Sequence, residues 1–400
     1  MTITAQSGLR EPIVAGIVTA LVGFTSSFAV VIAGLRAVGA TPEQAASGLF
    51  ALTVVFGIGI IVLSVRSRAP ITLAWSTPGA ALLVSMGAGH DAGWAAAVGA
   101  FLVVGGLILL VGLIPVLGDL ISRIPTPIAQ AMLGGVLLSL CLAPMESLAA
   151  EPLLTLPVLI AWLVATRVVA RWALPLTLLT ALVVIAVYVW GHGTEQPVES
   201  TWLPSLSWTT PQLDVAAIAG IAIPLFVVTM ASQNIPGVAV LSSFGYATPW
   251  RAAMTVTGAG TAVIAPFGGH AMNLAALSAA LAAGEEAGPD RSRRWIAGVS
   301  AGVGYLVLAV LSGALVTVAT IAPGGLVEAV AGLALLGTFA AALVGAFTAV
   351  ETRIPAALTF VAAASGLTFL GIGGAFWGLV IGLVTHAALR ATTSAPSTGR

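Results

Sequence analysis

Charge is the scarcest property of this 400-residue sequence. Only 7% of the residues are charged, the fourteen basic residues are all arginine, and fourteen acidic residues balance them to a formal net charge of zero. Soluble domains carry charge on roughly a quarter of their residues. The hydrophobic fraction is 59% and the mean hydropathy is +1.10, so we expect the chain to lie in a lipid bilayer. A chain with no excess of basic residues presents no basic face for nucleic acid.

Cysteine is nearly absent as well. The single cysteine, Cys141, excludes an intramolecular disulfide and a cysteine-rich metal or iron–sulfur centre. We find no nucleophile–base pair, no paired carboxylates and no spacing typical of metal ligands. The sequence therefore predicts no catalytic residue, no metal and no cofactor, which disfavours an enzyme within the membrane.

Long runs without Asp, Glu or Arg are what the sequence has in abundance. A bilayer core of about 30 Å takes roughly 20 apolar residues per helix. The runs that we interpret as spans 1 to 7 are 12–35, 44–65, 69–90, 92–118, 124–145, 152–166 and 172–194. The runs after the next polar stretch are 215–250, 252–284, 295–327, 329–350 and 354–389. We expect 252–284 to divide near Pro266 and 354–389 near residue 371, which predicts fourteen transmembrane helices.

Arginine positions predict the orientation of these helices. If the amino terminus is cytoplasmic, thirteen of the fourteen arginines fall on the cytoplasmic side and only Arg36 falls outside, in agreement with the positive-inside rule. A signal peptide is disfavoured because the first apolar run is longer than the apolar region of such a peptide. We therefore expect a multi-pass membrane protein with both termini in the cytoplasm.

The two halves of the chain resemble each other at an offset of about 200 residues. The matching segments are Ala15-Gly16-Ile17 with Ala219-Gly220-Ile221, Ala69-Pro70 with Ala265-Pro266, Trp94 with Trp295, and 128–138 with 326–336. Because each half holds seven spans, an odd number, the second half enters the membrane from the opposite side, which predicts an inverted repeat. The alternative is coincidence in a chain rich in Ala, Gly and Leu.

Spans 3 and 10 each carry a helix break at corresponding positions. Pro78 forbids a continuous helix through the preceding turn, while Thr77 followed by Pro78 suits a helix start. We therefore expect an extended piece over 71–75, followed by a half-helix that begins in mid-membrane. In span 10, Gly268-Gly269 is the break and the helix is expected to resume near 270–273. Two half-helix N-termini meeting there would form an anion site. The alternative is that Pro and Gly merely bend both helices.

Few polar side chains lie at the depth of these breaks. Span 1 contributes Thr25, Ser26 and Ser27, for which helix packing through small residues is an equal alternative to ligand contact. Gln233 and Asn234 of span 8 are costlier to bury, which favours a binding role. His270 is the only titratable group in the middle of a broken span, and such a residue is a functional candidate by default. A histidine that holds two backbones together is the alternative.

Three segments resemble those of the benzoate/proton symporter (BenE) family of bacterial inner membranes. They are 74–83 (AWSTPGAALL), 233–241 (QNIPGVAVL) and 266–276 (PFGGHAMNLAA), and the resemblance runs through essentially the whole chain. It implies proton-coupled uptake of an aromatic carboxylate, on the all-α fold of two inverted seven-span repeats shared with nucleobase permeases. Relatives with this fold often form homodimers, but the sequence identifies no interface.

The resemblance also implies a division into two domains. Spans 1–4 and 8–11 would form a core domain that carries the substrate, over residues 12–118 and 213–322. Spans 5–7 and 12–14 would form a gate domain, over residues 124–191 and 325–390. Nucleobase permeases place acidic residues on spans 8 and 10, where this chain has Gln233 and His270. This departure makes His270 the predicted proton-coupling residue.

The predicted site holds no arginine, which favours a monoanion with a large apolar body over sulfate. A cotransported proton removes the cost of about 2.3 kcal/mol per 100 mV for importing a monoanion against an inside-negative potential. The aromatic residues near enough to line a ring pocket are Phe24, Phe28, Trp75, Phe226 and Phe267. The predicted substrate-binding residues are Thr25, Ser26, Ser76, Thr77, Gly79, Gln233, Asn234, Gly269, His270 and Asn273.

The sequence thus predicts a secondary transporter that imports benzoate or a similar aromatic monocarboxylate with a proton by alternating access. Its expected partners are this carboxylate, the proton and the lipid bilayer. A transporter of another small ligand, such as a nucleobase or a different organic anion, stays open as an alternative. An anion channel is less favoured, because a channel needs a continuous polar pore and the sequence has only isolated polar clusters.

Overall fold

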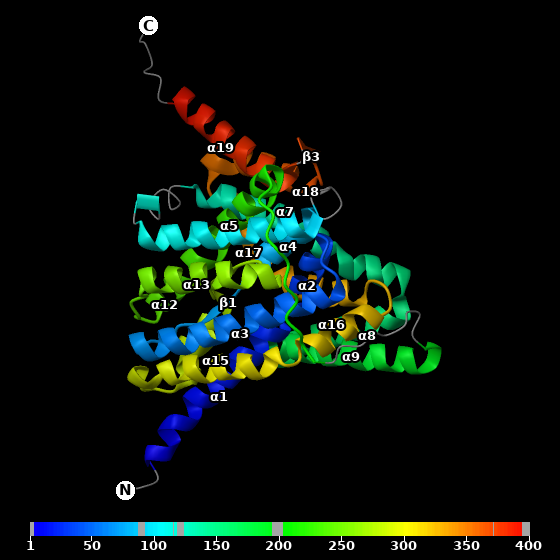
Figure 1. The fold of residues 1–400 in the computed structure, drawn as a ribbon, viewed down its shortest axis with the longest axis vertical. Coiled ribbons are helices and arrows are strands. Elements are labelled where there is room, and N and C mark those ends of the chain that lie inside the picture. The colour runs from blue at the N-terminus through cyan, green and yellow to red at the C-terminus, as the bar shows by residue number, and fades with distance from the viewer. Residues whose placement is uncertain are drawn as a thin grey trace.

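The computed structural model describes residues 4–86, 93–114, 116–117, 124–193, 203–370 and 372–393. In this part of the chain, seven helices are long and apolar enough to cross a bilayer. An eighth is added if Arg291–Ala309 and Ser312–Ile321, which meet at 53°, form one span. The predicted break at residue 371, and the predicted ends of spans 3 and 4 at 90 and 118, lie outside the described residues. The chain is a mostly helical, multi-pass membrane protein (Figure 1).

The first half contains nine helices or helical turns and one strand among its described residues. They are α1 (Thr4–Thr25), α2 (Phe28–Ala37), α3 (Pro42–Ser67), β1 (Leu73–Trp75), α4 (Thr77–Met86), α5 (Gly93–Leu113), α7 (Thr126–Ala150), α8 (Pro152–Val168), η1 (Ala170–Trp172) and α9 (Ala173–His192). Local signals set some of these bounds. Helix α3 starts with a capping box, in which the Thr41 hydroxyl accepts from the Gln44 amide and the Gln44 side chain accepts from the Thr41 amide.

The second half begins with one long span over Val215–Ser243. Its pieces are α10 (Val215–Ala217), η2 (Ile218–Ala222), α11 (Ile223–Thr229), η3 (Met230–Asn234) and α12 (Ile235–Ser243), of which η2 and η3 are π-helical. Such π-bulges are frequent at functional sites. The next elements are α13 (Trp250–Ile264), η4 (Ala265–Phe267), β2 (Met272–Leu274), α14 (Leu277–Ala283), η5 (Glu285–Ala287), η6 (Arg291–Arg293), α15 (Trp295–Ala309) and α16 (Ser312–Ile321).

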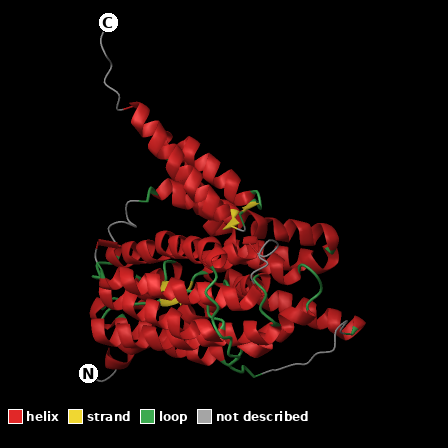
Figure 2. Cartoon of the chain, turned by 45° about the horizontal axis from the view of Figure 1, so that its top comes forward, coloured by secondary structure: helices red, strands yellow, loops and turns green. Residues whose placement is uncertain are grey.

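The chain ends with α17 (Leu326–Phe347), η7 (Val350–Thr352), α18 (Arg353–Ala364), β3 (Thr368–Phe369), β4 (Ile372–Gly373) and α19 (Gly374–Thr393). Strands β3 and β4 form a small hairpin between α18 and α19. Figure 2 shows this last helix pair projecting from the rest of the helical body, with the hairpin at its base. The predicted run 354–389 is therefore interrupted between residues 365 and 373.

The helices pack in two groups. In the first group, α5, α13, α3 and α15 lie side by side in that order (Figure 1), and α1 packs on α15. Glycines bring these backbones together, since a Cβ atom on Gly105 of α5 would lie 2.5 Å from the backbone nitrogen of Ala262 on α13. In the second group, α7 packs on α17 and α18, α8 on α9, and α18 on α19. We call the first group, together with α2, β1, α4, the pieces from α10 to α12, β2, α14 and η5 that pack on it, the core group, and the second group with η1 the gate group. These names describe packing alone.

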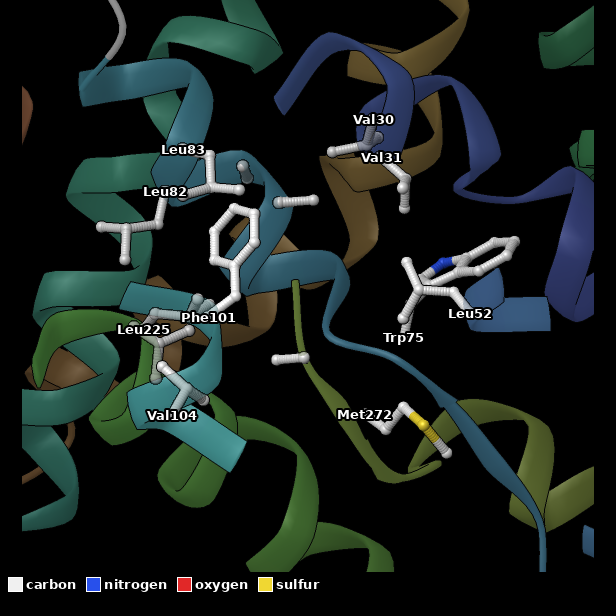
Figure 3. Packing of buried hydrophobic residues seen from close by; sticks show 14 of the residues in the cluster. Val30, Val31, Leu52, Trp75, Leu82, Leu83, Phe101, Val104, Leu225 and Met272 are labelled. Carbon is white, nitrogen blue, oxygen red and sulfur yellow. The ribbon is translucent and has the colours of Figure 1, made fainter. Parts of the chain in front are cut away.

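Strands β1 and β2 join the two halves of the chain at the centre of the core group. They pair antiparallel, with Leu73 opposite Leu274, Ala74 opposite Asn273, and Trp75 opposite Met272. This antiparallel register is compatible with a two-fold relation between the halves. Figure 3 shows Trp75 and Met272 on these neighbouring extended segments, with Leu52 beside Trp75, while Phe101 lies near Leu82 and Leu83 in the same buried cluster. The pairing satisfies backbone groups that have no water to bond to in hydrocarbon.

The helix starts after both breaks differ in detail from the prediction. The residue that caps α4 is Ser76 and not Thr77, because the Ser76 Oγ atom accepts from the Gly79 amide at 3.1 Å. The prediction that the span 10 helix resumes near 270–273 is wrong, since α14 starts at Leu277. The physical reason is that residues 271–275 are held extended by hydrogen bonds to the β1 segment.

Candidate functional site

A cavity lies where the broken spans of the core group meet the gate group. The space between its lining atoms is about 620 Å³ with the open mouth included. The core group lines it with Gly23, Ser26, Ser27, Ala74, Trp75, Thr77, Pro78, Gln233, Ala275, Ala276, Ser278 and Tyr305, and the gate group with Leu174, Ala334, Leu335 and Thr338. The walls of the cavity therefore come from both groups.

The described lining of the cavity is uncharged. Hydroxyl groups and one amide supply its polarity, while alanines, leucines and Trp75 supply its apolar surface. The first turn of α4 opens onto it through Thr77. Pro78 has no N–H, and the Gly79 amide is already bonded to Ser76, which leaves the amide and hydroxyl of Thr77 as donors. The positive end of the α4 dipole favours a negative group at this point.

Ser76 holds the broken spans together behind the cavity. Its amide donates to the Ala271 carbonyl at 2.9 Å, and its Oγ atom accepts from the Thr229 hydroxyl at 2.8 Å in addition to the Gly79 amide. Its carbonyl accepts from the Nε2 atom of His270 at 3.0 Å. Ser76 is fully buried, so these bonds fix the start of α4 against span 8 and span 10.

Asn234, at the end of the π-helical segment η3, supports the second break. Its Oδ1 atom accepts from the Leu274 amide at 2.8 Å, and its Nδ2 atom lies 3.2 Å from the Met230 sulfur. Asn273, on β2, is fully buried, and neither of its side-chain amide atoms has a hydrogen-bond partner among the described residues. An unpaired buried amide is costly and calls for an explanation.

His270 lies beside the cavity and not in its lining. The ring is fully buried, with its centroid 6.3 Å from that of Phe101. Because a carbonyl can only accept, the bond to Ser76 places the proton of the neutral ring on Nε2. The Nδ1 atom then carries a buried lone pair without a partner in the described part of the chain.

An aromatic cluster forms the floor of the cavity. Trp75 contacts Phe24 and Phe56 edge to face at centroid distances of 5.4 and 5.5 Å, and Phe56 contacts Tyr305 in the same way at 4.7 Å. The Trp75 indole donates to the Ser27 Oγ atom at 2.8 Å. The Tyr305 hydroxyl is hydrogen-bonded to Ser278. Two of the four rings, Trp75 and Tyr305, reach the cavity surface.

The ten predicted binding residues separate into two layers. Three line the cavity, namely Ser26, Thr77 and Gln233. The other seven lie outside the lining: Thr25, Ser76, Gly79, Asn234, Gly269, His270 and Asn273. Of the five aromatic candidates, Trp75 alone belongs to the described lining.

Sequence reasoning missed several lining residues. Ser278 and Tyr305 belong to the core group, and Thr338 belongs to the gate group; Ser27, a candidate together with Thr25 and Ser26, also lines the cavity. Tyr305 carried a usable signal, since it is one of only three tyrosines in the chain and stands within an uncharged run. Ser278 and Thr338 carried none, because hydroxyl residues are common in packed membrane helices.

Nearly the whole chain also matches a known protein family. Residues 9–388 match the family model described as benzoate membrane transport protein (BenE). The chain belongs to this family. The benzoate membrane transport family is one of transport proteins and not of enzymes, and the chain is accordingly a membrane transporter.

Relatives of this benzoate transport family member cover nearly its full length. It is 35% identical to the inner membrane protein YdcO of Escherichia coli (strain K12), over 94% of this chain and 95% of that protein. It is 29% identical to the benzoate membrane transport protein of Acinetobacter baylyi, over 93% of both chains.

Solved structures show the fold. The transmembrane domain of the cyanobacterial bicarbonate transporter BicA matches 96% of this chain and 97% of its own, with a TM-score of 0.62 at 16% identity. Murine Slc26a9, an anion transporter in the inward-facing state, also matches 96% of this chain and 68% of its own, with a TM-score of 0.62 at 11% identity. The benzoate transport family member thus has the fold of these anion transporters.

Proposed function

We propose that this transporter imports an aromatic monocarboxylate together with a proton, with benzoate as the reference substrate. The observation that carries the proposal is the uncharged cavity at the start of α4, which combines a helix end and neutral donors with an aromatic floor, in a chain of the benzoate transport family. A site without a full positive charge suits one negative charge on a large apolar body.

The substrate pose follows from the two kinds of lining surface. The carboxylate lies at the start of α4, where Thr77 and Gln233 donate hydrogen bonds to it and Ser26 lies near. The ring lies over Trp75 and against Leu174 and Leu335 of the gate group. Hydrogen bonds to a charged group contribute about 1.5–3 kcal/mol each, so these few donors are enough to orient the ligand.

Alternating access would come from movement of the core group against the gate group. We propose that the core domain holds 12–118 and 213–322 and that the gate domain holds 124–191 and 325–390. We further propose fourteen spans in two inverted repeats of seven, with both termini cytoplasmic. The antiparallel pairing of β1 with β2 supports the inverted relation, and the bias of the arginines to one side supports the orientation.

Proton coupling is assigned to His270. It is the one imidazole in the middle of the described helical body, and its Nδ1 lone pair has no partner there. It is linked to the cavity through Ser76, whose carbonyl it contacts and whose next residue, Thr77, lines the cavity. A proton taken up together with the monoanion makes transport electroneutral.

Uptake into proteoliposomes tests the substrate and the coupling. Labelled benzoate should accumulate when the outside is made more acidic than the lumen, and a protonophore should abolish the accumulation. Protein-free liposomes measure the leak of neutral benzoic acid. Accumulation equal to that leak, or insensitive to the protonophore, would overturn the proposal. Unlabelled benzoate should compete, whereas stronger competition by uracil or bicarbonate would identify a different substrate class.

The variant His270→Gln tests the residue assigned to the proton. Glutamine can still donate to the Ser76 carbonyl but does not titrate. We expect the variant to exchange benzoate across the membrane without a gradient and to lose proton-driven accumulation. Retained accumulation would show that the proton travels elsewhere and that His270 only positions Ser76.

A further inference from the structure

A second recess, which shares no lining residue with the cavity, lies at the end of α3 and the start of α13. This groove is lined by Val62, Leu63, Arg66, Ser67, Pro249, Trp250, Arg251, Ala252, Thr255 and Val256, and it has a volume of about 1200 Å³ with its open side included. The last turn of α3 and the first turns of α13 form its two walls. We call it the arginine groove.

Two guanidinium groups of the groove have no acidic partner among the described residues. Arg66 and Arg251 are both exposed, and the ion pairs of the described residues involve neither of them. No Asp or Glu occurs between residues 44 and 90 or between 215 and 284, so both walls lack acidic residues. The nearby Arg68 differs, because its guanidinium lies 4.4 Å from the centroid of the Trp295 ring.

The hydroxyl groups in the groove are already engaged as donors. Ser67 donates to the Leu63 carbonyl and Thr255 to the Arg251 carbonyl, each at 2.7 Å. The two guanidinium groups and the Trp250 indole therefore supply the side-chain donors of the groove, and the planar shape of a guanidinium suits bidentate contact with a phosphate.

The same groove continues into apolar surface along both spans. Val62 and Leu63 on α3 and Val256 on α13 belong to its lining. Farther along the same helices, Ile58 and Val263 are exposed by 49% and 63%, as expected for side chains that face lipid tails. Trp250 stands at the helix end, where tryptophan is enriched at membrane–water interfaces.

We propose that the arginine groove binds one anionic phospholipid. The phosphate lies between Arg66 and Arg251, beside Trp250, and an acyl chain follows the apolar surface toward the middle of the membrane. A phospholipid would use both the two arginines and the apolar wall of the groove, whereas a free phosphate would use the arginines alone. Basic recesses between transmembrane helices are known to bind such headgroups.

Native mass spectrometry of the purified full-length protein tests the proposal by titration with phosphatidylglycerol. Each basic residue near the surface contributes about 1 kcal/mol of attraction, so Arg66→Gln or Arg251→Gln should weaken the apparent Kd about fivefold, and the double variant about 30-fold. The matched control is Arg36→Gln, because Arg36 is an exposed arginine in the last turn of α2, outside the groove. This variant should bind phosphatidylglycerol like the parent protein. Equal binding by the double variant and the control would overturn the proposal.

Two further titrations distinguish an anionic lipid from a neutral lipid and from a free anion. Phosphatidylcholine should bind more weakly than phosphatidylglycerol to the parent protein and should bind equally to the parent and the double variant. Soluble glycerol phosphate should not compete with phosphatidylglycerol, and full competition would assign the groove to a free anion. The variant Arg66→Lys with Arg251→Lys keeps both charges and should retain most of the binding. Loss of binding equal to that of the glutamine variant would contradict the electrostatic part of the reasoning.

Discussion

Gln233 and Asn234 are neighbours in sequence with opposite expected roles, and exchanging each for alanine separates binding from folding. Asn234 is fully buried and accepts from the Leu274 amide at 2.8 Å. Asn234→Ala leaves that amide unpaired in the core, which costs about 1–3 kcal/mol of stability. Gln233 lines the cavity and is only half-buried, so Gln233→Ala should change stability by less than about 0.5 kcal/mol.

For substrate affinity we expect the opposite order, with Gln233→Ala weakening benzoate binding more than Asn234→Ala does. A hydrogen bond from Gln233 to a carboxylate is worth about 1.5–3 kcal/mol, which predicts a benzoate Kd that is about 10- to 150-fold weaker in Gln233→Ala. Asn234→Ala should retain measurable affinity where it stays folded. Reversible unfolding in mixed micelles gives the stabilities, and equilibrium binding of labelled benzoate gives the affinities. A stable Asn234→Ala protein, or Gln233→Ala binding benzoate as tightly as the parent, would refute this division of roles.

Three other substitutions are predicted from the geometry. A Cβ atom on Gly23 would lie 2.0 Å from the Tyr305 hydroxyl oxygen, so Gly23→Ala should lower the free energy of unfolding by about 1–3 kcal/mol through overpacking. Adding Tyr305→Phe removes this oxygen and should restore the unfolding midpoint. An unrestored midpoint would contradict the contact. Ser76→Ala removes the α4 cap and should lower the free energy of unfolding by about 1 kcal/mol, measured by the same unfolding assay. An unchanged free energy of unfolding would contradict the role of Ser76 as the cap. Arg171 pairs with Glu286 at 2.9 Å between the gate and core groups. Arg171→Gln should leave stability within about 1 kcal/mol but change the labelling rate of a cysteine introduced into the cavity lining by Thr338→Cys, with the native Cys141 replaced by alanine. An unchanged labelling rate would exclude a role in holding this conformation.

The sequence was enough to locate both helix breaks, because their signals are local. Pro78 cannot continue a helix from the preceding turn, and Gly268 adopts a φ of 92° that favours glycine. The conformation of the residues after Gly268 could not be inferred in the same way. Residues 271–275 are extended because they pair with the β1 segment, and a partner about 200 residues away leaves no trace in the local pattern.

The same limit applies to the site. Thr77 and Gln233 could be predicted because each stands beside or near a proline in a broken or bulged span. Tyr305 and Thr338 reach the cavity only through the packing of α15 and α17 around it. For His270, the sequence indicated an intramembrane titratable group, whereas its contact with the Ser76 carbonyl required the three-dimensional arrangement.

The pairing of β1 with β2 also has a consequence for biogenesis. The amide of Ser76 and the carbonyl of Thr72 find their partners in Ala271 and Ala275, which leave the ribosome about 200 residues later. At roughly 5–20 residues per second, this delay lasts roughly 10–40 s. During that time the first half must keep unpaired peptide groups away from lipid, so the insertion machinery has to shelter it until the second half arrives. A chain truncated before Ala271 should therefore be degraded and should not accumulate in the membrane.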